Sequence, residues 1–133
     1  MTKAIRIYET GGPEVLRWEE DNPGKPGAGE ALVRHEAVGL NFIDVYHRTG
    51  LYPLPALPAV PGLEGAGIVE EIGEGVSEVA VGDRVAYAAI PPGAYAEVRR
   101  IPAHRLIKLP ENIPTSQGAA MMLQGMTARY LLK

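Results

Sequence analysis

The chain has 133 residues and a formal net charge of -3, and 46% of its residues are hydrophobic. A chain of this length can bury one continuous core without disulfides or a structural metal, so we expect a single domain. The absence of cysteine excludes disulfides, thiolate nucleophiles and zinc sites built on cysteine, and it fits a reducing, cytoplasmic compartment. Lys and Arg residues are scattered apart from the pair Arg99-Arg100, which argues against a nucleic-acid partner. No apolar run approaches the length of a membrane span, so we expect no membrane association.

The first third of the chain predicts short strands. Sixteen glycines and 12 prolines in an apolar-rich chain are typical of a mainly-β fold with tight turns. Apolar and polar residues alternate over 4–8 and 15–19 around a Gly-Gly-Pro turn, which predicts an opening hairpin. A loop is expected over 21–29 and a strand over 30–38. His35 lies in that strand, where we expect an exposed or hydrogen-bonded side chain and no ligand role, because no second histidine lies at a chelating spacing.

A polar segment follows this strand. Asn41 and Asp44 have the spacing of a helix capping box, which predicts a short helix to about Arg48, closed by Gly50. The prolines at 53, 55, 58 and 61 predict an extended, rigid connection that lies on a surface or lines a groove. Hydrogen-bonding side chains are unusually frequent here, which suggests the wall of a small-molecule site.

The glycine segment from 62 to 67, Gly-Leu-Glu-Gly-Ala-Gly, does not fit a dinucleotide fingerprint. Its spacing is G-x-x-G-x-G, and it precedes an expected strand, whereas the fingerprint follows a strand and opens a helix. Two interpretations of the glycines stay open: close backbone packing at a barrel corner, or bare backbone against a flat ligand. For Glu64, the sequence alone favours a solvated carboxylate at a strand end over a site residue.

The rest of the chain predicts a β-meander followed by helices. Strands are expected over 67–72, 84–88, 94–98 and 106–109, in a barrel-like arrangement. Thr115 or Ser116 can cap a helix that runs to Leu123, and a second helix is expected over 127–132. Met121, Met122 and Met126 are interpreted as core or interface residues.

Each candidate side chain also has a purely structural interpretation. Asn41 and Asp44 could serve only the helix start, while Tyr46 and Tyr52 could bury their rings and leave their hydroxyls in water. His47 and His104 are interpreted as surface residues. The hypothesis of a small-molecule site depends on the convergence of these residues beside a rigid groove. No sequence motif supports hydrolase chemistry.

Five segments resemble the zinc-independent quinone oxidoreductases, relatives of zeta-crystallin in the medium-chain dehydrogenase/reductase superfamily. They are Lys3-Ala-Ile-Arg-Ile-Tyr-Glu-Thr-Gly-Gly-Pro-Glu-Val-Leu, Val38-Gly-Leu-Asn-Phe-Ile-Asp-Val-Tyr-His-Arg-Thr-Gly50, Pro61-Gly-x-Glu-Gly-Ala-Gly, Val81-Gly-Asp-Arg-Val-Ala-Tyr and Met122-Leu-Gln-Gly-Met-Thr-Ala.

The resemblance implies a GroES-like, partly open β-barrel with short helices and a C-terminal helical segment. Members of the family normally continue into a Rossmann domain that holds NADPH, and we expect that domain to be absent here. The implied organisation is a GroES-like catalytic domain over 1–123 and a truncated connecting helix over 124–133.

The resemblance also implies roles for particular residues. The intact enzyme is expected to pass a hydride or electrons from NADPH to a quinone or enone, and to be a cytoplasmic homodimer. The expected roles are catalytic for Asn41, Tyr46 and Tyr52, substrate-binding for Asp44, Arg48 and Glu64, and cofactor-binding for Asn41, Gln124 and Thr127.

Zinc-dependent members of the superfamily place a cysteine at the position of Asn41 and a histidine at that of Leu63. Neither Asn41 nor Leu63 is a usable ligand for the catalytic zinc. Zinc-dependent members often also insert a lobe with four cysteines, and only Ile90-Pro-Pro-Gly93 stands at that position here. We therefore expect neither zinc site. Two alternatives stay open: a stand-alone, non-catalytic GroES-like binding or structural module, and half of a zinc alcohol dehydrogenase, which should bind stoichiometric zinc.

Overall fold

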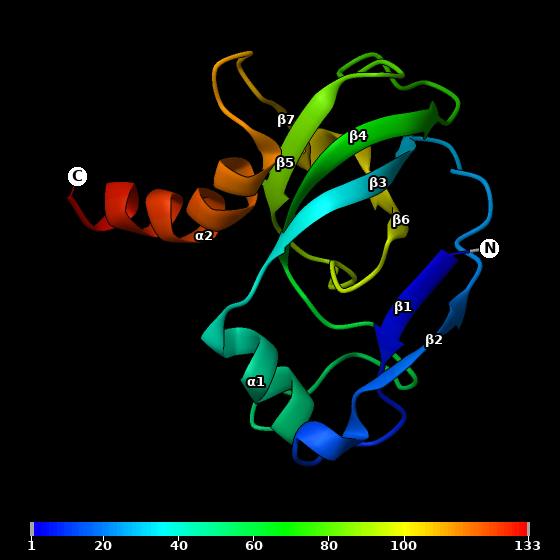
Figure 1. Ribbon diagram of the computed structural model, residues 1–133, viewed down its shortest axis with the longest axis vertical. Coiled ribbons are helices and arrows are strands. Elements are labelled where there is room, and N and C mark those ends of the chain that lie inside the picture. Colours follow the sequence, from blue (N-terminus) through cyan, green and yellow to red (C-terminus); the bar gives the residue numbers. More distant parts are fainter. Residues whose placement is uncertain (1, 133) are drawn as a thin grey trace.

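The computed structural model describes residues 2–132 and shows two antiparallel sheets and two α-helices (Figure 1). The strands β1 (Thr2–Arg6) and β2 (Arg17–Asp21) form a hairpin. The larger sheet has the order β6-β3-β4-β5-β7. Its strands are β3 (Glu30–Gly39), β4 (Glu64–Ile72), β5 (Arg84–Ala88), β6 (Val98–Pro102) and β7 (Ile107–Lys108). The helices are α1 (Phe42–Thr49) and α2 (Thr115–Leu132), and the short 3-10 turns are η1 (Pro13–Val15) and η2 (Ala103–Arg105).

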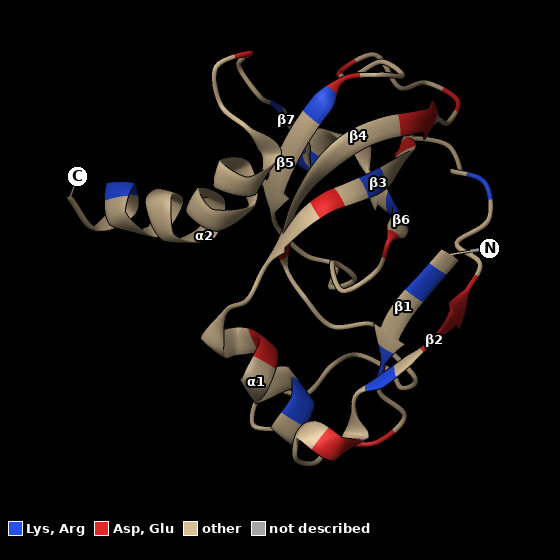
Figure 2. Ribbon diagram, in the orientation of Figure 1, with Lys and Arg blue, Asp and Glu red and all other residues tan. Residues whose placement is uncertain are grey.

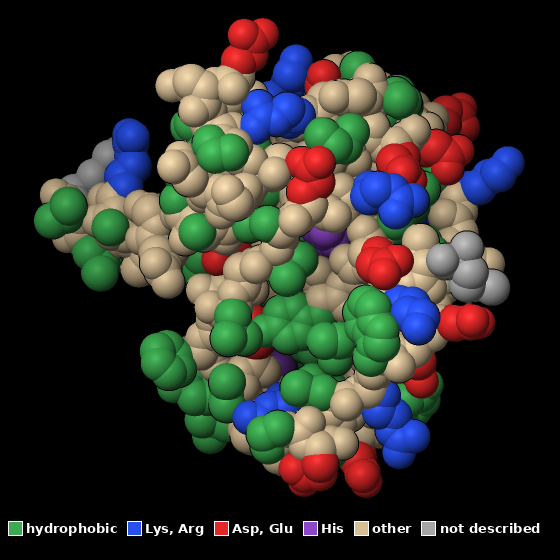
Figure 3. Space-filling view, viewed as in Figure 1, with side chains coloured by type: hydrophobic (Ala, Val, Ile, Leu, Met, Phe, Trp, Pro, Cys, Tyr) green, Lys and Arg blue, Asp and Glu red, His purple; other side chains and the backbone are tan. Residues whose placement is uncertain are grey.

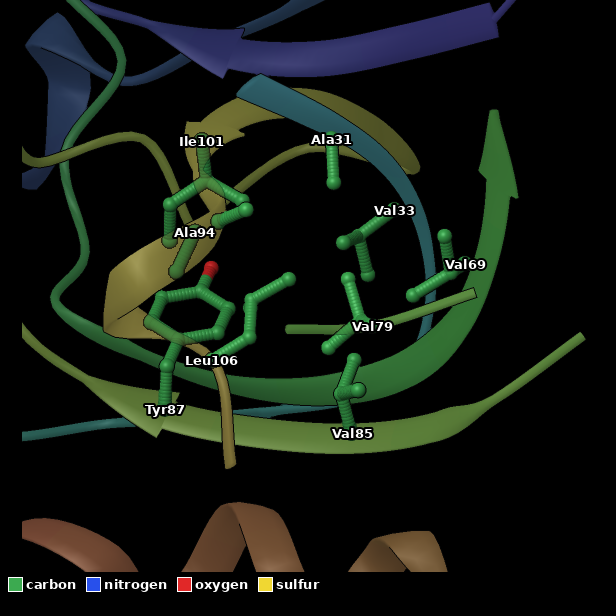
Figure 4. Close-up of a cluster of buried hydrophobic side chains, with 10 residues drawn as sticks. Ala31, Val33, Val69, Val79, Val85, Tyr87, Ala94, Ile101 and Leu106 are labelled. Atoms are coloured by element: carbon green, nitrogen blue, oxygen red, sulfur yellow. The ribbon is translucent and has the colours of Figure 1, made fainter. Parts of the chain in front are cut away.

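The five-stranded sheet curves around the main core, as Figure 4 shows. Val33, Val85, Tyr87 and Ile101 are fully buried on its inner side. These residues come from β3, β5 and β6, so strands distant in sequence share one apolar interior. The predicted mainly-β class is confirmed.

Helix α2 packs on the other side of this sheet. A second cluster joins Ala66 of β4 and Ala86 of β5 to Ala119 and Met122 of α2. Alanines on the strands let the helix approach closely, and Met122 fills the contact as a flexible apolar side chain. The interpretation of Met122 as a core residue is confirmed, while Met121 and Met126 lie exposed.

Several predicted elements are confirmed. The opening hairpin, the strand over 30–38 and the strand over 84–88 are all present. Helix α1 begins after Asn41 and ends at Gly50, whose φ of 88° is the left-handed conformation that glycine adopts without strain. The proline segment is largely exposed, but it bends over residues 55–58, so the expected extended course holds only in part; Ala59 bonds to Ile7 through backbone N–O contacts of 2.9 and 3.0 Å.

Other expectations are wrong. The strand expected over 94–98 forms instead at Val98–Pro102, where it pairs with the first half of β3. The two expected helices are a single helix, α2, because glycine at 125 weakens a helix by about 1 kcal/mol without ending it. The predicted domain boundary after residue 123 stays a prediction, and it falls inside α2.

Most of the glycine segment lies in β4, which begins at Glu64, and only Gly62 and Leu63 precede the strand. A methyl group on Gly65 would lie 2.8 Å from His35 Cδ2 and 3.1 Å from the Tyr87 hydroxyl. One on Gly67 would collide with the backbone carbonyl of Arg34 on the neighbouring strand. Close packing therefore explains both glycines, and side chains already cover Gly65, so the bare-backbone interpretation does not hold for it.

Lys and Arg residues alternate with Asp and Glu along the described elements (Figure 2). Arg6 pairs with Glu19 at 2.9 Å and also with Asp21, which joins the two strands of the hairpin. Within residues 2–132, no helix is long and apolar enough to cross a membrane.

Candidate functional site

The N-terminus of α1 is joined to the barrel through Asp44. Its carboxylate accepts the backbone N–H of Asn41 at 3.1 Å and the hydroxyl of Tyr95 at 2.6 Å. Burial and the adjacent Asp44 raise the pKa of Tyr95, so the hydroxyl stays protonated and donates. Because Asp44 is only 3% exposed, it holds the start of the helix in place and presents little surface to a ligand.

Glu64 is buried, with 2% of its surface exposed, so the expectation of a solvated carboxylate is wrong. It accepts the side-chain Nδ2–H of Asn41 at 2.9 Å through Oε1 and the backbone N–H of Leu123 at 2.9 Å through Oε2. The physical reason is that β4 starts at Glu64, in the middle of the sheet, and α2 covers this end of the strand. Glu64 thus touches both α1 and α2.

The candidate residues of α2 lie around the same contact. Gln124 follows Leu123 directly and lines, with Glu64, a depression of about 310 Å³ between the end of β3 and α2. Thr127 is one helical turn further along and donates its hydroxyl to the Leu123 carbonyl at 2.8 Å. The three proposed cofactor residues, Asn41, Gln124 and Thr127, are therefore linked through Glu64 and Leu123.

Two tyrosines lie at the other end of α1. The rings of Tyr46 and Tyr52 meet edge to face with their centroids 5.4 Å apart, and Tyr52 is 54% exposed. The Arg48 guanidinium donates to the carbonyl of Gly11, in the connection between β1 and β2, at 2.8 Å. Tyr52 is thus accessible and Tyr46 half-buried, while Arg48 has a structural partner.

The surface interpretation of His47 is wrong, whereas that of His104 is confirmed. His47 is 9% exposed because it lies on the face of α1 turned to the protein interior, and its Nδ1 has no hydrogen-bond partner among the described atoms. Between residues 2 and 132, no three His, Asp or Glu side chains gather to hold a metal ion. The expected absence of zinc stays a prediction.

A second polar network was not predicted. His35 contacts the Ala96 carbonyl through Nδ1 and the Tyr87 hydroxyl through Nε2, each at 2.7 Å, while Arg99 donates to the same hydroxyl at 3.3 Å. Burial is the main cause that lowers the pKa of His35 to about 4, and the charge of Arg99 acts in the same direction. Neutral His35 then donates from Nδ1 and accepts from Tyr87, which confirms a hydrogen-bonded strand histidine.

Sequence patterns gave no signal for Arg99, Tyr87 or Tyr95 as partners of these polar groups. These contacts join residues 12 to 52 positions apart, so they depend on sheet topology and not on local periodicity. The network supports the barrel wall, while the Asn41 and tyrosine groups lie along α1 toward the surface.

Apolar side chains gather over the lower part of the face in Figure 3 and at the outer end of α2. Among exposed residues, Leu40 and Phe42 flank Asn41 with 77% and 82% exposure. An amide donor, tyrosine hydroxyls and apolar surroundings can bind a flat, carbonyl-bearing molecule through hydrogen bonds to its oxygens.

Comparisons with known proteins add three findings. The alcohol dehydrogenase GroES-like domain matches residues 27–111. A quinone oxidoreductase of Pseudomonas aeruginosa is 50% identical over 133 residues, which cover all of this chain and 41% of the relative. A 2-haloacrylate reductase of Burkholderia sp. is 44% identical over 138 residues, which cover 99% of this chain and 41% of that protein.

Solved structures agree with these matches. The crystal structure of Escherichia coli quinone oxidoreductase complexed with NADPH matches with a TM-score of 0.96 and 46% identity, over 98% of this chain and 40% of that one. The chain therefore spans about two fifths of the length of the relatives it matches.

Proposed function

This chain belongs to the alcohol dehydrogenase GroES-like domain family, and we propose that it is the substrate-side domain of an NADPH-dependent quinone oxidoreductase. The observation that carries the proposal is the contact of Asn41 with Glu64, which holds an uncharged donor at the surface end of the barrel beside α2. The names of the similar proteins from Pseudomonas aeruginosa and Escherichia coli support the reaction class.

Asn41, Tyr46 and Tyr52 form the proposed reacting end of the site. Bound NADPH supplies a hydride, and one proton from solvent completes the two-electron reduction of a quinone to a hydroquinone. A hydrogen bond from the Asn41 amide stabilises the negative charge that develops on one quinone oxygen, while the tyrosine hydroxyls, at the other end of α1, donate to the second oxygen or another polar group of the substrate. The resemblance to a 2-haloacrylate reductase supports an activated alkene, such as an enone, as a second substrate class.

The proposed site is held in place by three supporting residues, Asp44, Arg48 and Glu64. Asp44 and Glu64 are buried and hold Asn41 through its backbone and its side chain, while Arg48 ties α1 to the hairpin connection. Their contribution to substrate binding is thus to fix the groups that touch the substrate.

Gln124 and Thr127 form the proposed cofactor side. Both are exposed on α2, and the Thr127 oxygen keeps acceptor capacity after its proton is donated to the Leu123 carbonyl. An amide such as the nicotinamide carboxamide carries the matching N–H donors, so these residues fit that group.

We also propose that the site works without zinc. Leu63 is 7% exposed and aliphatic, and the neutral amide of Asn41 is not among the Cys, His, Asp and Glu ligands that bind zinc in proteins, so neither residue replaces a zinc ligand. Metal analysis of the purified protein tests this directly, and stoichiometric zinc would instead support a zinc alcohol dehydrogenase half.

The proposed roles are tested in a chimera in which this chain replaces the matching 133 residues of the Pseudomonas aeruginosa relative. We expect Asn41→Ala to lower kcat for quinone-dependent NADPH oxidation about 100-fold, the effect of losing one donor to a developing oxyanion. Tyr52→Phe should lower turnover as well, without changing the thermal unfolding midpoint. Tyr130→Phe, at an exposed position distant in sequence, is the matched control. Unchanged kinetics for both Asn41→Ala and Tyr52→Phe would reject the assignment.

A further inference from the structure

Glu64 connects two parts of the chain that carry different proposed roles. We propose that Glu64 is a positioning residue that couples helix α2 to the Asn41 side chain, so that the orientation of the Asn41 amide depends on the position of α2. The catalytic consequence of this coupling rests on the proposed function, but the coupling itself is a property of this chain.

Each oxygen of the Glu64 carboxylate has its own donor. Oε1 accepts from Asn41 Nδ2 and Oε2 from the Leu123 backbone N–H, both at 2.9 Å. Within residues 2–132, Glu64 takes part in no ion pair. A carboxylate that is only 2% exposed is stabilised by these donors in place of water, so each contact resists displacement.

The packing around Glu64 leaves little freedom for α2 to move alone. A methyl group on Gly39 would lie 2.7 Å from the Ala119 carbonyl oxygen of α2 and would also collide with Glu64 Oε1. The end of β3, the Glu64 side chain and α2 are therefore in direct contact. A shift of α2 toward β3 has to displace Glu64, and Glu64 then carries its hydrogen bond to Asn41 with it.

The same contact fixes which way the Asn41 amide faces. An ionised carboxylate only accepts hydrogen bonds, so one N–H of the Asn41 NH₂ group is directed at Glu64 and the second N–H is left for a ligand. Gln124 directly follows Leu123 in the chain, and Thr127 lies one helical turn beyond Leu123. A single carboxylate thus sets the relative position of the proposed reacting amide and the proposed cofactor side.

The test uses the near-isosteric variant Glu64→Gln in this 133-residue chain, followed by NMR. A glutamine side chain has only one acceptor oxygen, so if that oxygen keeps the Leu123 N–H, its NH₂ group faces Asn41, and the Asn41 amide has to turn over or lose its partner. We expect hydrogen exchange of the Leu123 amide to rise about 10- to 100-fold, or the Asn41 side-chain NH₂ resonances to shift and broaden. Exchange of core amides in β5 serves as the internal control.

A double variant separates positioning from general destabilisation. In Asn41→Asp combined with Glu64→Gln, the new amide can donate to the new carboxylate at position 41 and still accept from Leu123, which restores both contacts and reverses the direction of the contact with position 41 only. We expect Leu123 exchange to return to within about threefold of the wild-type rate, whereas Asn41→Asp alone places two carboxylates together and should itself raise Leu123 exchange. Wild-type values for both probes in Glu64→Gln would overturn the proposal.

If Glu64→Gln does not fold, the hydrogen bond between Leu123 and Glu64 can be measured in the wild-type chain. A scalar coupling across the hydrogen bond, between the Leu123 amide nitrogen and the Glu64 carboxylate carbon, should be detectable, and its absence under conditions that show backbone couplings in β4 would overturn the proposal. None of these measurements involves NADPH or a quinone. A failure of the coupling is therefore distinguishable from a failure of the proposed function, which only the chimera tests.

Discussion

Acidification should destabilise the folded chain through His35 in particular. Folding lowers the pKa of this imidazole from 6.5 to about 4, mainly through burial beside Tyr87 and Arg99. Between these two values the unfolded chain binds a proton that the folded chain does not bind. Stability therefore decreases as pH falls through this window.

The magnitude follows from the width of the window. A difference of about 2.5 pKa units corresponds to about 3 kcal/mol at full protonation of the unfolded state, and about 2 kcal/mol is lost already at about pH 5. This is a substantial part of the 5–15 kcal/mol that stabilises a typical domain. Below about pH 4 the folded state also binds the proton, so His35 causes no further loss.

The assay is urea unfolding of the wild type and of His35→Gln at about pH 7.5 and about pH 5. Glutamine does not titrate, so the free energy of unfolding should fall by about 2 kcal/mol less on acidification in the variant than in the wild type. His104→Gln removes an exposed imidazole and should leave the wild-type pH dependence in place. Equal losses in the wild type and in His35→Gln would refute the assignment of this pH dependence to His35.

Two further predictions concern packing and buried hydrogen bonds. Gly65→Ala should destabilise the chain by about 1–3 kcal/mol, because the new methyl group would lie 2.8 Å from His35. Gly125→Ala meets no neighbouring atom within 4 Å outside its own helix and should stabilise α2 by up to about 1 kcal/mol. Urea unfolding of both variants tests whether the two changes in stability have opposite signs. Tyr95→Phe removes the hydroxyl that donates to buried Asp44 and should lower the free energy of unfolding by about 1.5–3 kcal/mol. Tyr130→Phe, at an 80% exposed position, is the control and should change it by less than about 0.5 kcal/mol. Equal effects of the two variants in thermal unfolding would contradict the stabilising role of the Tyr95 contact.

Local patterns predicted those parts of the fold that depend on neighbouring residues. The hairpin follows from alternation around a Gly-Gly-Pro turn, and α1 follows from Asn41, Asp44 and Gly50, which act within one or two helical turns. The strand at 84–88 was likewise placed correctly, because its pattern ends at clear turn residues.

Features that depend on long-range packing were not predictable in this way. The burial of Glu64 requires α2, which lies about 60 residues later in the chain and supplies the Leu123 N–H. His47 is buried by contacts outside its own helix, and Tyr95 reaches Asp44 across 51 positions. The polar residues of the candidate site were found from their density, but the residues that hold them were not.

The central claim is that this chain forms one side of an NADPH-dependent quinone-reducing site. The most direct measurement compares quinone-dependent oxidation of NADPH by the isolated chain and by the chimera with the remaining part of the Pseudomonas aeruginosa relative. We predict steady-state turnover in the chimera and none in the isolated chain. A correctly folded chimera without quinone-dependent turnover would contradict the claim and favour a non-catalytic GroES-like module.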